Sequence, residues 1–171
     1  MGENEVDRVE LQTKIGTLQV QEHDIIQFPT GILGFADLHR YVLVEQEDSF
    51  FSFLQSVDEP ALAFIVMMPE LVCCQYSVKL NEEEIELLQF SSPEDGKVYA
   101  IVTVPENVAE MTVNLQAPVV INSKNRLGAQ IVVPEGPYHT KHNVLAEMQK
   151  NAFFLEKQKS AQKDEEVRES V

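Results

Sequence analysis

The stretch YVLVEQEDSFFSFLQSVDEPALAFIVMM, residues 41–68, decides the fold. It contains three runs, residues 41–44, 50–57 and 62–68, that are rich in the β-branched and aromatic side chains typical of strands. Pro60 and Pro69 bracket the third run, because proline cannot donate a hydrogen bond inside a sheet. The stretch therefore predicts three short strands joined by loops.

Further β-like runs occur on both sides of this stretch. Two short runs flank Lys14-Ile15-Gly16 and predict a hairpin, and in residues 75–80 the side chains of Tyr76, Val78 and Leu80 share one face. The remaining runs are residues 25–28, 98–104, 112–114, 119–122 and 129–133. About ten short strands with one helix among them predict an all-β protein, a small antiparallel β-barrel or barrel-like sandwich.

One short helix is expected inside this β-rich body. Asn81 is a suitable N-cap, and Glu84 follows three residues later, as in a capping box. Ile85 and Leu88 are expected to face the core from this helix, before the polar segment 91–96 ends it.

The last part of the chain differs from the body, and we divide the chain into a β-barrel domain, residues 1–143, and a helical extension, residues 144–171. Leu145, Met148, Ala152 and Leu155 recur at spacings of three and four, which places them on one stripe of a helix. Docking on the chain's own barrel and contact with another chain both explain that stripe. After Lys157 the sequence is polar and has no stripe, so this end is expected to be partly disordered.

Composition excludes several functional classes. The 171 residues carry 28 acidic and 13 basic side chains, a formal net charge of −15. This charge disfavours nucleic acid and an anionic membrane as direct partners, but it permits a basic protein. There is no apolar run of membrane-spanning length and no signal peptide. The two cysteines, Cys73 and Cys74, are adjacent and unsuited to a disulfide, which indicates packing roles and a cytoplasmic location.

The search for catalytic chemistry is negative. No motif for nucleophilic, nucleotide-dependent or zinc-dependent catalysis occurs, so we expect neither an enzyme nor a cofactor. His139 and His142, with Glu135 nearby, are the strongest metal candidates, and a small metalloenzyme is the alternative that they leave open. Two histidines at this spacing without a third strong ligand are more typical of surface or capping residues.

The features that remain suit protein binding. The phenylalanines at positions 50, 51 and 53 occupy both faces of one strand, and core packing of all three is the simplest interpretation. Met67 and Met68 point away from each other, although both could still be buried. An exposed Met68 beside Glu70 and Leu71 would form an adaptable contact site for a basic partner.

Several strings stand in order along the chain and together resemble a known family. They are FPTGILGF (28–35), LQSV (54–57) with Pro60 and LAF (62–64), VTVP (102–105) and MTVNLQAPVVIN (111–122). The similarity continues through Arg126, Gly128 and Gln130 to Tyr138 and His142. Over residues 8–142 the chain thus resembles the flagellar assembly factor FliW family, and the first and last strings together are specific to it.

The resemblance implies a non-enzymatic protein that we expect to be a monomer when free. Proteins similar to this one bind the translational repressor CsrA, a small basic RNA-binding dimer, and relieve its repression of flagellin mRNA. They also bind flagellin, and the two partners compete. The alternative is a flagellin export chaperone with no regulatory role. The candidate partner-binding residues are Met68, Glu70 and Leu71 at the turn and Asn114, Gln116 and Asn122 on the motif strand, where packing is the other explanation for the two asparagines.

Overall fold

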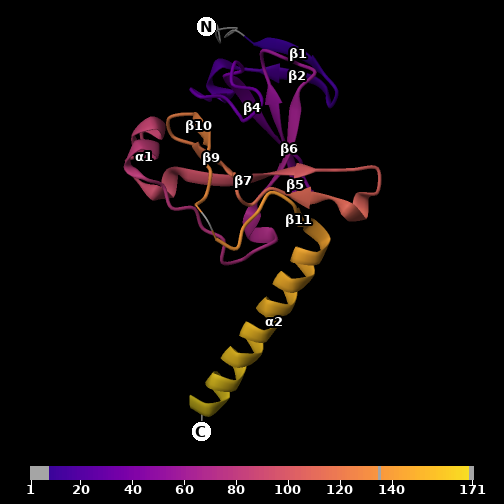
Figure 1. Cartoon of the computed structure of the whole chain (residues 1–171), viewed down its shortest axis with the longest axis vertical. Helices are drawn as coiled ribbons and strands as arrows, with labels where there is room; N and C mark the ends of the chain where they lie inside the picture. Colours follow the sequence, from indigo (N-terminus) through magenta and orange to yellow (C-terminus); the bar gives the residue numbers. More distant parts are fainter. Residues whose placement is uncertain (1–7, 135, 170–171) are drawn as a thin grey trace, which may run out of the picture.

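A computed structural model of the chain describes residues 8–134 and 136–169, and Figure 1 shows its architecture. The described residues form eleven short strands, two α-helices and four 3-10 turns. The strands are β1 (Val9–Thr13), β2 (Gly16–Val20), β3 (Ile25–Gln27), β4 (Arg40–Glu45), β5 (Phe51–Ser56), β6 (Ala63–Met67), β7 (Gly96–Thr103), β8 (Thr112–Val113), β9 (Val119–Asn122), β10 (Leu127–Gln130) and β11 (His142–Asn143). The helices are α1 (Glu82–Leu88) and α2 (Val144–Glu169), and the 3-10 turns are η1 (Glu22–Asp24), η2 (Pro69–Leu71), η3 (Pro93–Asp95) and η4 (Val108–Glu110).

Seven of the described strands close into a barrel. Their order is β7-β6-β5-β4-β3-β10-β9, and a pairing between β9 and β7 completes the ring. These pairings are antiparallel except for β10 with β3, which is parallel through Leu127 and Gln27. Strands β8 and β11 continue the sheet outward from β7. The predicted all-β barrel with one short helix and a helical tail is confirmed.

The barrel interior holds the largest buried side chains, because residues on a strand alternate between its two faces. Phe28, Tyr41 and Leu54 are at most 1% exposed there, and the rings of Phe28 and Tyr41 meet edge to face with centroids 5.0 Å apart. Phe28 also lies against Gly128, where an added Cβ would stand 2.5 Å from the ring. Only glycine leaves room for this ring, so Gly128 is needed for close packing.

The outer face of the barrel is covered in three places. The hairpin of β1 and β2, confirmed at the predicted position, packs Leu11 and Val20 against β3 and β4. Helix α1 places Leu88 over β9 and β10, and it lies on one flank of the barrel in Figure 1. The segment from η2 to Tyr76, strand β8 and the first turns of α2 cover β6 and β7. The first of these covers, the β1–β2 hairpin, is a second, two-stranded sheet.

Helix α1 begins as the sequence predicts. The Oδ1 atom of Asn81 accepts from the Glu84 N–H (2.8 Å), and the Asn81 N–H donates to a Glu84 carboxylate oxygen (2.9 Å). Leu88 is fully buried, as expected. The prediction that Ile85 also faces the core was wrong, because Ile85 is 41% exposed and lines a groove.

Two strand predictions differ from the structure. Residues 75–80 were expected to form a strand, but no strand of the described chain pairs with them. Their side chains do alternate in burial, so the pattern correctly indicated an extended segment. It could not show that this segment has no hydrogen-bonded neighbouring strand. The strand expected at residues 129–133 is found two residues earlier, as β10, Leu127–Gln130. Beyond its end, the N–H groups of Ile131 and Val133 still donate to the carbonyls of Pro118 and Gln116, but outside a regular strand.

The structure shows that Phe50 and Met68, whose burial the sequence left open, are both exposed. Core packing of all three phenylalanines was wrong, because Phe50 is 59% exposed while Phe51 and Phe53 are half-buried. Met67 is buried and Met68 is 47% exposed, so the interpretation in which both methionines are buried was also wrong.

Helix α2 docks on the barrel body by its first two turns and by Asn151 at the start of the third. Val144 is fully buried and Met148 packs beside it, whereas Leu145 and Leu155 are 43% and 40% exposed. Figure 1 shows that the rest of the helix projects away from the barrel. The helix continues to Glu169, and the partial disorder expected after Lys157 stays a prediction.

Candidate partner-binding surface

The turn between β6 and α1 presents Met68 and Glu70 to solvent. Pro69 occupies the first position of η2, and the N–H groups of Leu71 and Cys73 donate to the carbonyls of Met68 (3.1 Å) and Pro69 (2.9 Å). Leu71 is half-buried and packs toward the barrel. The structure therefore places two of these three predicted residues on an ordered, accessible turn.

A side chain from α2 fixes this turn from outside. The Oδ1 atom of Asn151 accepts from the Cys74 N–H (2.8 Å), and its amide nitrogen donates to the carbonyls of Glu70 (3.3 Å) and Leu71 (3.2 Å). These three hydrogen bonds satisfy backbone groups that a turn leaves unpaired. Asn151 thus links the extension to the segment that carries Met68.

Tyr76 connects the turn to the motif strand. Its hydroxyl donates to the carbonyl of Leu115 (2.7 Å), and its ring meets that of Tyr138 edge to face at 4.8 Å. Burial raises the pKa of the Tyr76 hydroxyl, and the neighbouring Tyr138 and Cys73 add to the effect. Tyr76 is therefore a neutral hydrogen-bond donor under physiological conditions, and its role here is structural.

The motif asparagines have internal hydrogen-bond partners. The Oδ1 atom of Asn114 accepts from the N–H groups of Gln116 (3.1 Å) and Ala117 (2.9 Å), which shapes the turn before β9. Asn122 is 1% exposed, and its amide nitrogen donates to the carbonyls of Leu88 (2.9 Å) and Gln89 (3.3 Å) at the end of α1. Gln116 and Asn114 are half-buried, so they keep some accessible surface, whereas Asn122 is enclosed. The six candidates therefore do not form one surface.

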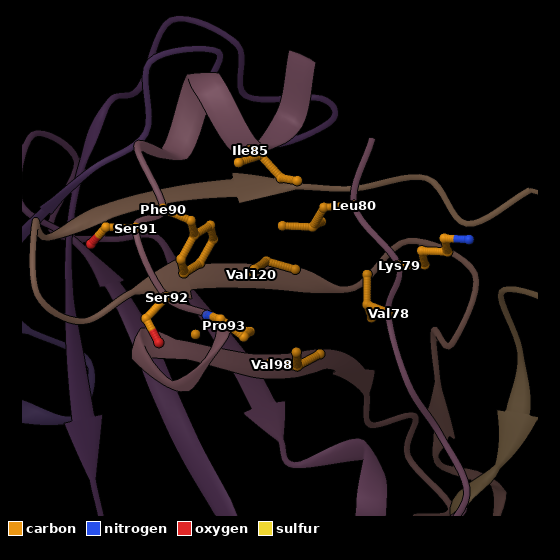
Figure 2. A pocket seen from close by; sticks show the side chains of 11 residues that line it. Val78, Lys79, Leu80, Ile85, Phe90, Ser91, Ser92, Pro93, Val98 and Val120 are labelled. Atoms are coloured by element: carbon orange, nitrogen blue, oxygen red, sulfur yellow. The ribbon is translucent and has the colours of Figure 1, made fainter. Parts of the chain in front are cut away.

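An apolar groove lies beside α1 and was not predicted from the sequence. Figure 2 shows Val78 and Leu80 on one side of it, Phe90 and Pro93 on the other, and Ile85 at one end. Its volume is about 470 Å³, and the outer faces of β7 and β9 contribute Val98 and Val120 as a floor. A concave apolar surface of this size can receive side chains of another molecule.

Acidic side chains are frequent on the two elements that flank this groove, α1 and η3. Residues 77–95 contain six carboxylates and a single base, Lys79, which is itself one of the residues that line the groove. Four of these carboxylates are on α1, at positions 82, 83, 84 and 86, and two are on η3. The groove therefore combines an apolar floor with two flanking elements of net negative charge, which together complement a segment that carries both apolar and basic residues.

A second feature that was not predicted from the sequence is an exposed apolar side chain at the tip of a loop. Leu33 is 67% exposed, and its N–H donates to the Oε1 atom of Gln130 (2.9 Å). The loop turns at Gly31, where φ is +68° and an added Cβ would meet the Phe35 carbonyl oxygen at 2.6 Å. The glycine spacing in residues 28–35 was the available signal, because it requires a tight turn that presents its central residues.

The histidine pair shows no metal-binding arrangement in the described chain. The rings of His139 and His142 stack with centroids 3.7 Å apart, and the Nε2 atom of His142 accepts from the His139 N–H (3.0 Å). His142 is 8% exposed and faces Glu147 at 3.5 Å, whereas Glu135 lies outside the described residues. Residues 8–134 and 136–169 contain no group of three or more candidate ligands that could hold a metal ion.

Comparison with known proteins gives consistent matches over the barrel. The sequence profile described as FliW protein matches residues 10–144. The flagellar assembly factor FliW of Alkaliphilus metalliredigens is 43% identical over 143 residues, which cover 82% of this chain and 88% of that protein. The FliW of Treponema pallidum is 38% identical over 141 residues, covering 82% of this chain and 94% of that protein. A crystal structure of the flagellar assembly factor FliW superposes with a TM-score of 0.75 at 37% identity, covering 80% of this chain and 96% of the other.

Proposed function

This chain belongs to the FliW family of flagellar assembly factors, and from this premise we propose that it regulates flagellin synthesis by binding two proteins in competition. One partner is a CsrA-type repressor, the basic dimer that blocks translation of flagellin mRNA. The other is flagellin itself. When free flagellin accumulates, it binds this protein and displaces the repressor. The released repressor then binds flagellin mRNA and stops flagellin synthesis until flagellin is exported. The observation that carries the proposal is family membership across nearly the whole barrel.

The charge of the chain supports the repressor arm of this proposal. A net charge of −15 attracts a basic protein and repels RNA from the complex. Carboxylates held near a bound repressor raise the free energy of keeping RNA phosphates at its surface, even without covering the RNA site. A tenfold loss of RNA affinity needs a coupling free energy of about 1.4 kcal/mol.

The surfaces described above support binding rather than catalysis. The groove beside α1 exposes Ile85 on a helix that carries four glutamates, and the turn exposes Met68 close to Glu70. Such an arrangement can bury apolar area at its centre and form ion pairs at its edge. The proposed role is therefore non-enzymatic and needs no cofactor. Within the described residues, no helix is both long and apolar enough to cross a membrane.

The test is a titration of the protein into the repressor bound to labelled flagellin-leader RNA at fixed salt, followed by flagellin. Release of RNA that flagellin reverses supports the regulatory cycle. No release of RNA together with a stable flagellin complex supports an export chaperone instead. Binding of neither protein refutes the proposal.

A matched pair of charge reversals locates the acidic contact. Glu86→Lys changes the exposed face of α1, and Glu110→Lys makes the same change on η4, which follows the opposite end of β7. We expect the first to weaken repressor binding about threefold or more, and the second to change it less. Equal effects of the two variants would show that only total charge matters.

A further inference from the structure

We propose that residues 77–80 are an open strand edge that receives an extended segment of the basic repressor, whose apolar side chains enter the groove beside α1. This inference rests on the proposed function and specifies its contact. The mode of binding is the addition of a strand to an existing edge, in which main-chain hydrogen bonds supply affinity and alternate side chains supply specificity.

The first observation is the conformation of residues 75–81. Exposed and covered residues alternate along the whole segment: Gln75, Ser77 and Lys79 are exposed, while Val78 and Leu80 are half-buried. A period of two is the signature of an extended strand with one face on the protein. The segment therefore already has the shape that a partner strand requires.

The second observation concerns its backbone. Within the described part of the chain, no backbone hydrogen bond involves residues 77–80, although Tyr76 before them and Asn81 after them are both held by such bonds. Unpaired N–H and C=O groups on an exposed extended segment form a template for another chain. Proline, which natural proteins use to protect such edges, is absent from residues 70–92.

The third observation is the groove that this edge borders. Val78 and Leu80 form one side of the apolar volume of about 470 Å³, and Phe90 and Pro93 form the other, as Figure 2 shows. A strand paired with residues 77–80 would place every second side chain over Val98 and Val120. The edge can thus pair with the main chain of an added strand, while the groove receives its side chains.

The charges indicate which partner fits. The two elements that flank the groove, α1 and η3, carry six carboxylates against one base, Lys79, in its lining, so a segment that carries lysine or arginine is attracted on balance. We therefore assign the edge to the basic partner.

Hydrogen exchange of the full-length protein tests the assignment. Amides of residues 77–80 are expected to exchange rapidly in the free protein, and alternate amides are expected to slow by about a hundredfold or more when the repressor dimer is bound. Slow exchange of these amides in the free protein, or protection by flagellin and not by the repressor, would overturn it. Repressor binding without protection of residues 77–80 would refute the strand edge and leave the proposed function standing, whereas absence of any binding would remove both.

A pair of apolar truncations provides an independent readout. Ile85→Ser removes an exposed side chain from the end of the groove, and Val108→Ser removes one of similar exposure, 59% against 41%, from η4. We expect the first to weaken repressor binding about tenfold and the second less than about twofold. Because both side chains are exposed, neither change should unfold the barrel, and equal affinities would contradict the groove contact.

Discussion

Removing the buried amide of Asn122 is expected to weaken the fold rather than a partner contact. Its amide nitrogen donates to the carbonyls of Leu88 and Gln89, and its Oδ1 atom accepts from the N–H groups of Lys124 (3.1 Å) and Asn125 (3.3 Å). One side chain therefore ties the end of α1 to the turn between β9 and β10. Asn122→Ala breaks all four hydrogen bonds and leaves the Leu88 carbonyl buried without its partner.

The size of the effect follows from these contacts. A neutral hydrogen bond contributes about 0.5–1.5 kcal/mol net, and an unsatisfied buried group costs about 1–3 kcal/mol. With partial relaxation of the surrounding turn, the free energy of unfolding should fall by about 2–4 kcal/mol. In a domain of this size each kcal/mol corresponds to about 2–4 °C, so Tm should fall by about 5–15 °C.

Thermal and urea unfolding followed by circular dichroism measure this loss, and Asn125→Ala is the matched control. The exposed Asn125 also donates to the Gln89 carbonyl (2.9 Å), but its removal leaves Asn122 in place and should cost about 0.5 kcal/mol or less. Asn122→Asp should be at least as damaging as Asn122→Ala, because a carboxylate cannot donate to the two carbonyls. An Asn122→Ala protein with unchanged Tm that has lost partner binding would refute this reasoning and place Asn122 at a contact surface.

Three further outcomes are expected. Gly128→Ala should lower the free energy of unfolding by about 1–3 kcal/mol, since its Cβ would overlap the Phe28 ring, and Phe28→Leu in the same chain should recover part of that loss in denaturation measurements. Asn151→Ala should speed amide exchange at residues 70–74 while leaving barrel amides protected, and unchanged exchange there would show that α2 does not hold the turn. Burial raises the pKa of all four tyrosines, so the folded protein keeps them neutral while the unfolded chain ionises near pH 10. Stability is therefore retained below that pH and lost above it, and tyrosinate absorbance should rise together with unfolding rather than before it.

The sequence predicted those parts of the fold that depend on local chemistry. The capping box at Asn81 and Glu84 and the hairpin at residues 14–16 each need only neighbouring residues, and both are confirmed. The extended segment at residues 75–80 was recognised from its alternation, but whether it has a neighbour depends on where the rest of the chain runs. For the same reason no local pattern indicated the parallel pairing of β3 with β10.

The candidate site was predictable to a smaller extent. Residue type and spacing indicated that the two methionines at the end of β6 point in opposite directions but left burial of both open, and only the structure shows that Met68 is exposed. They could not distinguish Asn114 and Asn122 as turn-forming side chains from contact residues, since both roles use the same amide. The groove escaped notice because its walls come from segments on either side of α1 and its floor from β7 and β9.

The parallel pair that closes the barrel has a consequence for synthesis of the chain. Gln27 meets Leu127, one hundred residues later, and the Gln27 N–H donates to the Arg126 carbonyl (2.9 Å). At about 5–20 residues per second, a ribosome reaches the second partner about 5–20 s after the first. Throughout that interval β3 has no partner on one side, and the ring cannot close. The barrel can therefore complete its fold only after Leu127 has been synthesised, and until then this edge of β3 stays open in the nascent chain.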